Sequence, residues 1–262
     1  MSYREEIEKT YSPQLTWDED IEYKGIKFYR VKMEDYYNFQ MASVCLSYDQ
    51  MEYADEVLAF KPRLYFLLEM GIRSLSNQLD FNHLETQLWF CFQALQALVF
   101  RDQKVGYYDP QNPERKVLVI NGIVLGQKDF DYIRELIFVA NGVEYDDEFM
   151  HHELKERIER DRAILNKQGS SEPETEDIID SVFMYSEKTY EFIKKMSVRK
   201  FNRYVKRMVS FEDWKILRTA SMSGMVTFKK EIKHWVSNYN KENKYEDILQ
   251  KKEDLLNKFS KI

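Results

Sequence analysis

The stretch at residues 117–142 constrains the fold most, because its hydrophobic pattern changes period within a few residues. Its first half places two short β-prone runs, 117–120 and 123–125, on either side of Asn121 and Gly122. An Asn-Gly pair readily adopts the two positive φ angles of a type I′ turn. The sequence therefore predicts a β-hairpin here.

The second half of this stretch changes to helical spacing after Gly126. The apolar residues at that spacing are Phe130, Ile133, Ile137 and Ala140. Asp129 and Asp131 are acidic residues of the kind that favour a helix start, and Asn141-Gly142 offers a left-handed stop. We expect a helix that follows the hairpin directly.

The N-terminal part repeats this combination of hairpin and helix. Lys24-Gly25 lies between two short β-prone runs, ahead of a helical pattern at 33–48. Residues 104–108 could add a third strand to the later hairpin, joined to it by a segment rich in turn-forming residues.

Further helices are expected from Pro62 onward and at 83–100. For the second of these, Asn82 and Glu85 fit a capping box, and its apolar character on most sides makes it the best candidate for a central core helix. A highly charged helix with a thin apolar stripe is expected at 148–167.

The predicted fold class is α+β, mainly α-helical. We expect a domain of small antiparallel hairpins packed on helices at 1–167, and a linker at 168–177, where Gly, Ser, Pro and acidic residues leave little to bury. An all-helical domain is expected at 178–262, with Ser197 as the N-cap of its longest helix.

Composition and charge narrow the classes of protein. With 44% hydrophobic and 32% charged residues, 8 Gly and 5 Pro, the chain is typical of a helix-rich globular protein without glycine-rich phosphate loops. No apolar run is long enough for a bilayer span and no leader pattern is present, so we expect no membrane partner. Charge is uneven: residues 1–186 hold 20 Lys and Arg against 35 Asp and Glu, whereas 187–233 hold 13 against 5.

No residue pattern is typical of catalysis, of a metal site or of cofactor binding. Cys45 and Cys91 lie far apart in apolar surroundings and are interpreted as reduced core thiols. The histidines at 83, 151, 152 and 234 have no metal-ligand spacing, and paired carboxylates are uninformative in so acidic a chain. We therefore expect a protein that is not an enzyme, without catalytic residues, metal or cofactor.

The basic segment at 194–218 allows three interpretations. Its cations include Arg199, Arg203 and Lys206, and they alternate with aromatic residues such as Trp214. Nucleic-acid readers use that combination, but a solvated helix with a buried seam has the same pattern. Because the whole chain is acidic, we favour a protein partner or a plain surface over nucleic acid.

The segment 219–235 is rich in methionine and small residues. It places Met222, Met225, Phe228 and Trp235 near a glycine, a composition suited to a groove that receives a partner helix. The alternative is that these residues fill the core of the C-terminal domain.

Three segments carry a family resemblance. Residues 22–39, 117–138 and 201–237, the last containing TASMSGMV, are similar in order and texture to tail assembly chaperones of tailed phages and prophages of Gram-positive bacteria. The resemblance implies a non-catalytic role: binding a long helical tail protein such as the tape measure and keeping it soluble.

The partner-binding residues expected on this basis are Arg199, Arg203, Lys206, Trp214, Met222, Met225, Phe228 and Trp235. The expected location is the cytoplasm of the bacterial host, with the virion as the alternative. A structural virion component of the baseplate, connector or tail, a nucleic-acid-binding regulator and a homo-oligomer stay open.

Overall fold

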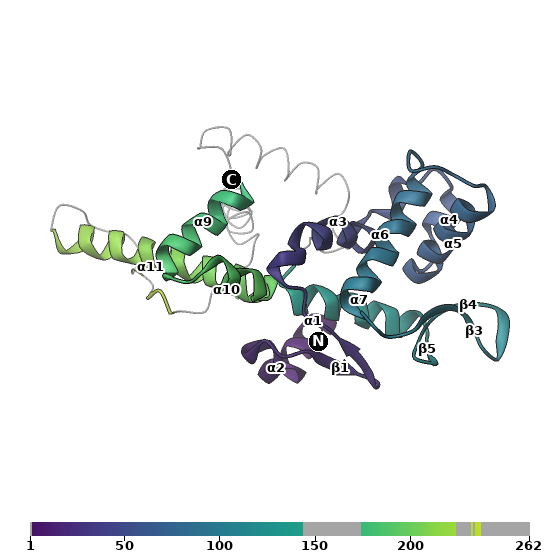
Figure 1. Ribbon diagram of the computed structural model, residues 1–262, viewed down its shortest axis with the longest axis horizontal. Helices are drawn as coiled ribbons and strands as arrows, with labels where there is room; N and C mark the ends of the chain where they lie inside the picture. The colour runs from purple at the N-terminus through teal and green to yellow at the C-terminus, as the bar shows by residue number, and fades with distance from the viewer. Residues whose placement is uncertain (1, 144–173, 224–231, 233, 237–262) are drawn as a thin grey trace, which may run out of the picture. The chain divides into compact units, whose positions relative to one another are not determined.

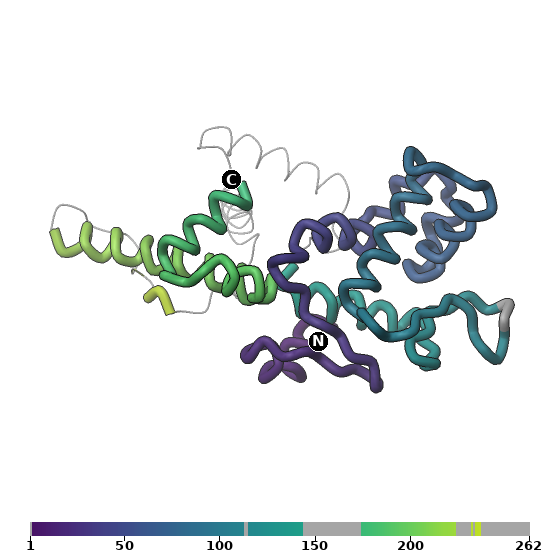
Figure 2. Tube along the Cα trace, in the orientation of Figure 1, coloured from purple at the N-terminus to yellow at the C-terminus, as the bar shows by residue number. Residues whose placement is uncertain are grey.

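The computed structural model describes residues 2–143, 174–223, 232 and 234–236, which are coloured in Figure 2 apart from residues 113–114. The chain divides into two compact units, residues 1–203 and residues 204–262. The predicted helix at 148–167 and most of the predicted linker lie outside the described residues, so that domain boundary stays a prediction.

The chain is mainly α-helical with two small antiparallel sheets, which confirms the predicted fold class (Figure 1). The strands are β1 (Ile21–Tyr23), β2 (Ile26–Phe28), β3 (Val105–Asp109), β4 (Asn112–Ile120) and β5 (Ile123–Leu125). The described helices are α1 (Tyr3–Thr10), α2 (Ser12–Trp17), α3 (Tyr36–Ser47), α4 (Glu56–Ala59), α5 (Arg63–Ser76), α6 (Leu84–Val99), α7 (Gln127–Asn141), α9 (Thr175–Ser186), α10 (Tyr190–Lys195) and α11 (Val198–Met222), with short 3-10 turns at Met33–Asp35 and Gln50–Glu52.

Both predicted tight hairpins are present. Lys24 and Gly25 have φ angles of 51° and 76°, and Asn121 and Gly122 have φ angles of 51° and 82°. Such paired left-handed residues let the turn follow the twist of the two strands. The predicted third strand is β3, which pairs antiparallel with β4 to give the sheet order β3-β4-β5.

Helix α7 confirms the expected switch in period. The four residues predicted to share one side, Phe130, Ile133, Ile137 and Ala140, are all buried. The amide of Gly126 donates to Asp129 Oδ2 at 3.3 Å at the start of the helix, and Gly142 closes it with φ 66°. Turn and cap residues at 117–142 thus act through backbone geometry.

The core of the first unit is built around α6, which packs against α3 and α5. Leu88, Phe92, Leu95 and Val99 of α6 are almost fully buried, as expected for a central helix. Gly71 of α5 allows the close approach, because a Cβ placed there would lie 2.6 Å from the Trp89 ring.

The predicted start of α6 was wrong in detail. His83 is the N-cap residue and makes no side-chain capping bond. The Asn82 side chain instead donates to Asp80 at 3.1 Å, while Glu85 accepts a 2.7 Å hydrogen bond from Tyr53. Both side chains that fit a capping box therefore have partners outside it.

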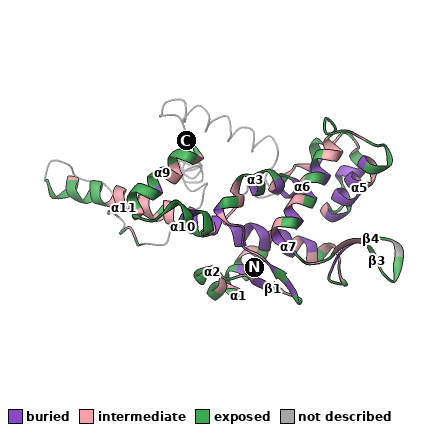
Figure 3. Ribbon diagram, viewed as in Figure 1, coloured by how far each residue is buried: buried purple, intermediate pink, exposed green. Residues whose placement is uncertain are grey.

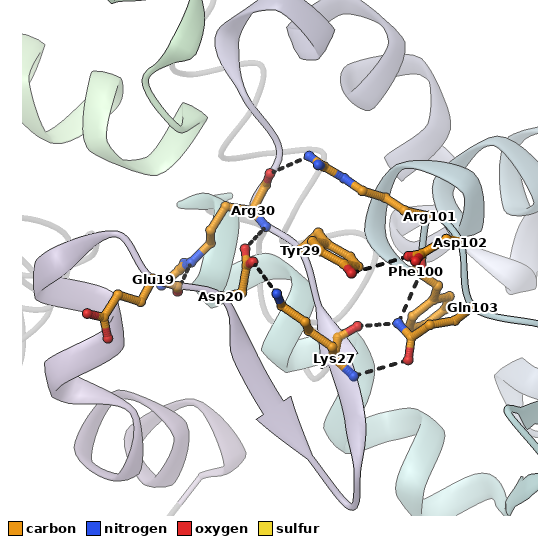
Figure 4. A network of polar contacts seen from close by, with 9 residues as sticks. All are labelled: Glu19, Asp20, Lys27, Tyr29, Arg30, Phe100, Arg101, Asp102 and Gln103. Atoms are coloured by element: carbon orange, nitrogen blue, oxygen red, sulfur yellow. Dashed lines mark hydrogen bonds and ion pairs between the residues drawn. The ribbon is translucent and has the colours of Figure 1, made fainter.

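A polar network centred on Arg30 joins the first hairpin to the rest of the unit (Figure 4). The buried Arg30 guanidinium donates to three carbonyl oxygens, of Glu19 at 2.9 Å, Gln14 at 3.2 Å and Ala140. Next to it, the Gln103 amide bridges the backbone N–H and carbonyl of Lys27. The hairpin is thereby fixed against α2, the end of α7 and the turn after α6.

Candidate partner-binding surfaces

The start of α11 is joined to the N-terminal part of the first unit by backbone hydrogen bonds. The Met33 amide donates to the Met196 carbonyl and the Val198 amide to the Val31 carbonyl, both at 2.9 Å. Between them Ser197 is buried, and its hydroxyl accepts from the Lys200 amide at 3.1 Å. The prediction that Ser197 is the N-cap of α11 is confirmed.

Arg199, the first of the expected partner-binding residues, is half-buried. Its guanidinium donates to the Leu15 carbonyl at 2.8 Å, near the end of α2. Burial lowers its pKa to about 10, and repulsion from Arg203 and Arg30 adds to that decrease. Arg199 therefore has a structural partner within the chain, whereas Arg203 is exposed.

Within the second unit, two expected residues are brought into one aromatic cluster. Trp214 lies 5.2 Å from the ring of His234, and Trp235 lies 5.2 Å from Phe211. Arg207 ties the cluster together by donating to the Trp235 carbonyl at 2.8 Å. Trp214 and Trp235 therefore pack in one group, although they are far apart in sequence.

The remaining expected residues of this unit are either exposed or outside the described part of the chain. Lys206 is exposed on α11, and Met222 is 78% exposed at the end of that helix. Met225 and Phe228 lie outside the described residues. The groove expected at 219–235 therefore stays a prediction.

A surface that the sequence interpretation missed lies on α9 and α10, which bury only one residue each, Val182 and Ile193. Figure 3 shows the contrast with α5 and α7, where buried residues are frequent. The large exposed side chains here are Phe183, Met184, Tyr185, Tyr190 and Phe192, which we call the α9–α10 apolar surface.

The geometry of this surface is set by one aromatic pair. Phe183 and Tyr190 stack with ring centroids 4.3 Å apart, and the Tyr190 hydroxyl donates to Asp180 at 2.8 Å. That hydrogen bond raises the pKa of Tyr190. Met184 is 80% exposed beside this pair. The signal available in the sequence was the run of four apolar residues at 182–185, more than one side of a helix can bury.

A second missed surface is the outer side of α3. Among the described helices of eight or more residues, α3 is the one without a charged side chain, and it exposes Tyr37, Met41 and Val44 at spacings of four and three. Beside it is a cleft of about 360 Å³, bordered by Tyr36, Gln40, Ser43, Val143, Val198 and Asn202 among others. Because 32% of the residues in this chain are charged, an exposed helix side without any charge is unusual. The outer side of α3 is therefore a second candidate surface.

The cysteines and histidines differ in their surroundings. Cys45 is buried, as expected for a core thiol, and burial raises its pKa far above the usual range. Cys91 is only partly buried, and burial raises its pKa too. His83 lies 3.8 Å from Asp80 on an exposed turn, and His151 and His152 lie outside the described residues.

The described part of the chain contains no group of three or more His, Cys, Asp or Glu side chains placed to hold a metal ion. None of its helices combines the length and apolar character needed to cross a bilayer.

Comparison with known proteins relates one part of the chain to a family. A family model described as the YomV second domain matches residues 166–240, which include α9, α10 and α11. The match is to a phage-type protein, so it supports the phage relationship implied by the resemblance. It does not indicate that the chain is a tail assembly chaperone. No curated protein matches the chain. No solved structure matches it either.

Proposed function

We propose that this chain is a non-enzymatic phage morphogenesis protein, a tail assembly chaperone that binds a helical tail protein such as the tape measure and keeps it soluble. The place of action in this proposal is the host cytoplasm. The observation that carries it is the α9–α10 apolar surface, which lies inside the segment similar to a phage-type domain.

The physical argument starts from how little α9 and α10 bury. Helices of 12 and 6 residues are marginal in water alone and gain stability mainly by burying an apolar side. Here one residue of each helix is buried, while five large side chains face outward. A partner covering those side chains would supply the missing burial.

The chemistry of the surface favours an apolar helical partner. Met184 is flexible and polarizable, so it can adapt to the apolar sides of different helices. The stacked Phe183–Tyr190 pair adds a rigid aromatic surface next to it. Surfaces of this kind receive the apolar side of an amphipathic helix. A tape measure exposes such helical seams before the tail tube encloses it.

Co-expression tests this proposal. The tape measure protein of the same phage or prophage is produced with and without this chain, and its soluble fraction is measured. We expect it to be soluble only with this chain. Equal solubility in both cases would contradict the proposal, and recovery of the chain in purified particles would indicate a virion component instead.

A matched pair of variants locates the binding surface. Met184→Glu places a charge on the α9–α10 apolar surface, and Met51→Glu makes the same change at a methionine that is 57% exposed outside the matched segment. Because burying a methionine is worth about 1.5–3 kcal/mol, Met184→Glu should weaken partner binding by about tenfold or more. Met51→Glu should leave it unchanged.

A further inference from the structure

A patch on the first unit combines positive charge with an exposed ring. It consists of Trp17, at the end of α2, and of Arg199, Lys200 and Arg203, in the first turns of α11; we call it the Trp17 patch. Trp17 is 75% exposed, although it is the largest kind of aromatic side chain. None of these residues belongs to the α9–α10 apolar surface.

Hydrogen bonds hold the two halves of the patch together. The Arg199 guanidinium donates to the Leu15 carbonyl at 2.8 Å, and Lys200 Nζ donates to the Thr16 carbonyl at 3.1 Å. Trp17 is the next residue after Thr16. Lys200 is therefore held at the residue that precedes the tryptophan, and Arg203 lies one turn of α11 beyond Arg199.

The positive charge of the patch is poorly compensated. The partners of Arg199 and Lys200 are neutral carbonyls, and Arg203 makes no hydrogen bond or ion pair with other described residues. Arg203 and Arg30 repel Arg199 more strongly than Glu8 and Asp18 attract it.

The acidic groups next to the patch do not cancel this charge. Asp18 accepts hydrogen bonds from the Ser197 hydroxyl and amide, and Glu19 is exposed. Against these two carboxylates and Glu8 are three cations within five consecutive residues of α11, two of them exposed, together with Arg30. An anionic ligand placed here would relieve the repulsion between Arg199 and Arg203.

Two properties decide which anion fits. An acidic peptide needs only the cations, whereas single-stranded nucleic acid needs cations for its phosphates and an exposed aromatic ring for its bases. From the pairing of Trp17 with Lys200 and Arg203 we propose that the Trp17 patch binds single-stranded nucleic acid, with a base stacked on Trp17 and phosphates on the two cations. This activity is independent of partner-protein binding.

Fluorescence anisotropy with the full chain and a fluorescein-labelled 15-mer of thymidine tests the proposal. We expect binding at about 50 mM salt that weakens as salt rises, with a log–log slope of about −1.4, because the two phosphate contacts on a single strand contribute about −0.7 each. Absence of binding at about 50 mM salt would overturn the proposal.

Variants distinguish the patch from general attraction to the chain. Trp17→Ala and Arg203→Glu should each weaken binding about tenfold. Trp17→Phe should keep most of it, since a ring remains. Lys128→Glu is the matched control, because Lys128 is an exposed lysine at the far end of α7 from Gly142, which contacts Arg199. An equal loss in the Lys128→Glu variant would overturn the proposal.

Competition separates single strands from other anions. Unlabelled single-stranded DNA should displace the probe, whereas polyglutamate of equal charge should need at least tenfold more. Equal displacement by polyglutamate, or unchanged binding by a Trp17→Ala variant with the wild-type melting temperature, would overturn the proposal in favour of an acidic protein segment.

Discussion

Replacing Gly71 by alanine should destabilise the protein, although the same change in the middle of most helices is stabilising. Gly71 lies inside α5, where alanine is favoured over glycine by about 1 kcal/mol on helix propensity. At this position the new Cβ would lie 2.6 Å from Cδ2 and Cε3 of Trp89 and 2.8 Å from Cε2. Carbon atoms in contact are normally about 3.5–4.0 Å apart, so the ring would have to retreat by about 1 Å.

The Trp89 ring has little room to retreat. It is 8% exposed and packs 4.8 Å from the Tyr107 ring and 5.9 Å from the Phe92 ring. Overpacking of this kind costs about 1–3 kcal/mol, which outweighs the gain in helix propensity. We expect Gly71→Ala to lower the free energy of unfolding by about 1–2 kcal/mol and Tm by about 3–6 °C.

Urea unfolding followed by circular dichroism measures this effect, and a double-mutant cycle identifies its cause. In a Trp89→Leu background the clash is removed, so Gly71→Ala should become neutral or stabilising, with a coupling energy of about 1 kcal/mol or more. The reasoning would be refuted by a Gly71→Ala variant that is more stable than the wild type.

Three further predictions follow from single contacts. Hydrogen bonding from Tyr53 lowers the pKa of Glu85. The ionised Glu85 carboxylate therefore stabilises the fold above about pH 4.3, and this stability is lost as pH falls through the lower pKa of the folded state. Glu85→Gln should flatten the acid limb of a plot of urea midpoint against pH, between about pH 3 and 6. In a Cys91→Ser variant, Cys45 should react with a thiol reagent only at the rate of unfolding, and fast labelling would contradict its burial. Arg30→Met removes this donor from the carbonyls of Glu19 and Ala140, whereas the Gln14 carbonyl keeps the Glu19 amide, and it should cost at least about 2 kcal/mol in urea unfolding. A loss below about 1 kcal/mol would contradict these contacts, of which Figure 4 draws the one to Glu19.

Local signals predicted the elements of the fold well. Lys24-Gly25 and Asn121-Gly122 specify their turns because few other pairs tolerate two left-handed residues, and the spacing from Phe130 to Ala140 places the buried side of α7. The start of α6 was predicted less well, since Asn82 bonds to its neighbour Asp80 and Glu85 has a tertiary partner in Tyr53, and both contacts compete with capping.

The candidate surfaces were harder to predict, because a side chain is exposed only where no other part of the chain packs against it. Arg199 and Arg203 are one helical turn apart, yet Arg199 donates a hydrogen bond to the Leu15 carbonyl, whereas Arg203 is exposed. Trp17 is the last residue of an ordinary short helix, and the hydrogen bond from Lys200 to the preceding residue, Thr16, brings a cation near it. These contacts join residues about 184 positions apart, and no local pattern encodes them.

Hydrogen–deuterium exchange of a complex with the tape measure protein tests the central claim most directly. The account predicts that amides of α9 and α10, Thr175–Ser186 and Tyr190–Lys195, exchange more slowly in the complex, while the already buried α5 is unchanged. Protection confined to other parts of the chain, or no complex at all, would contradict binding through the α9–α10 apolar surface.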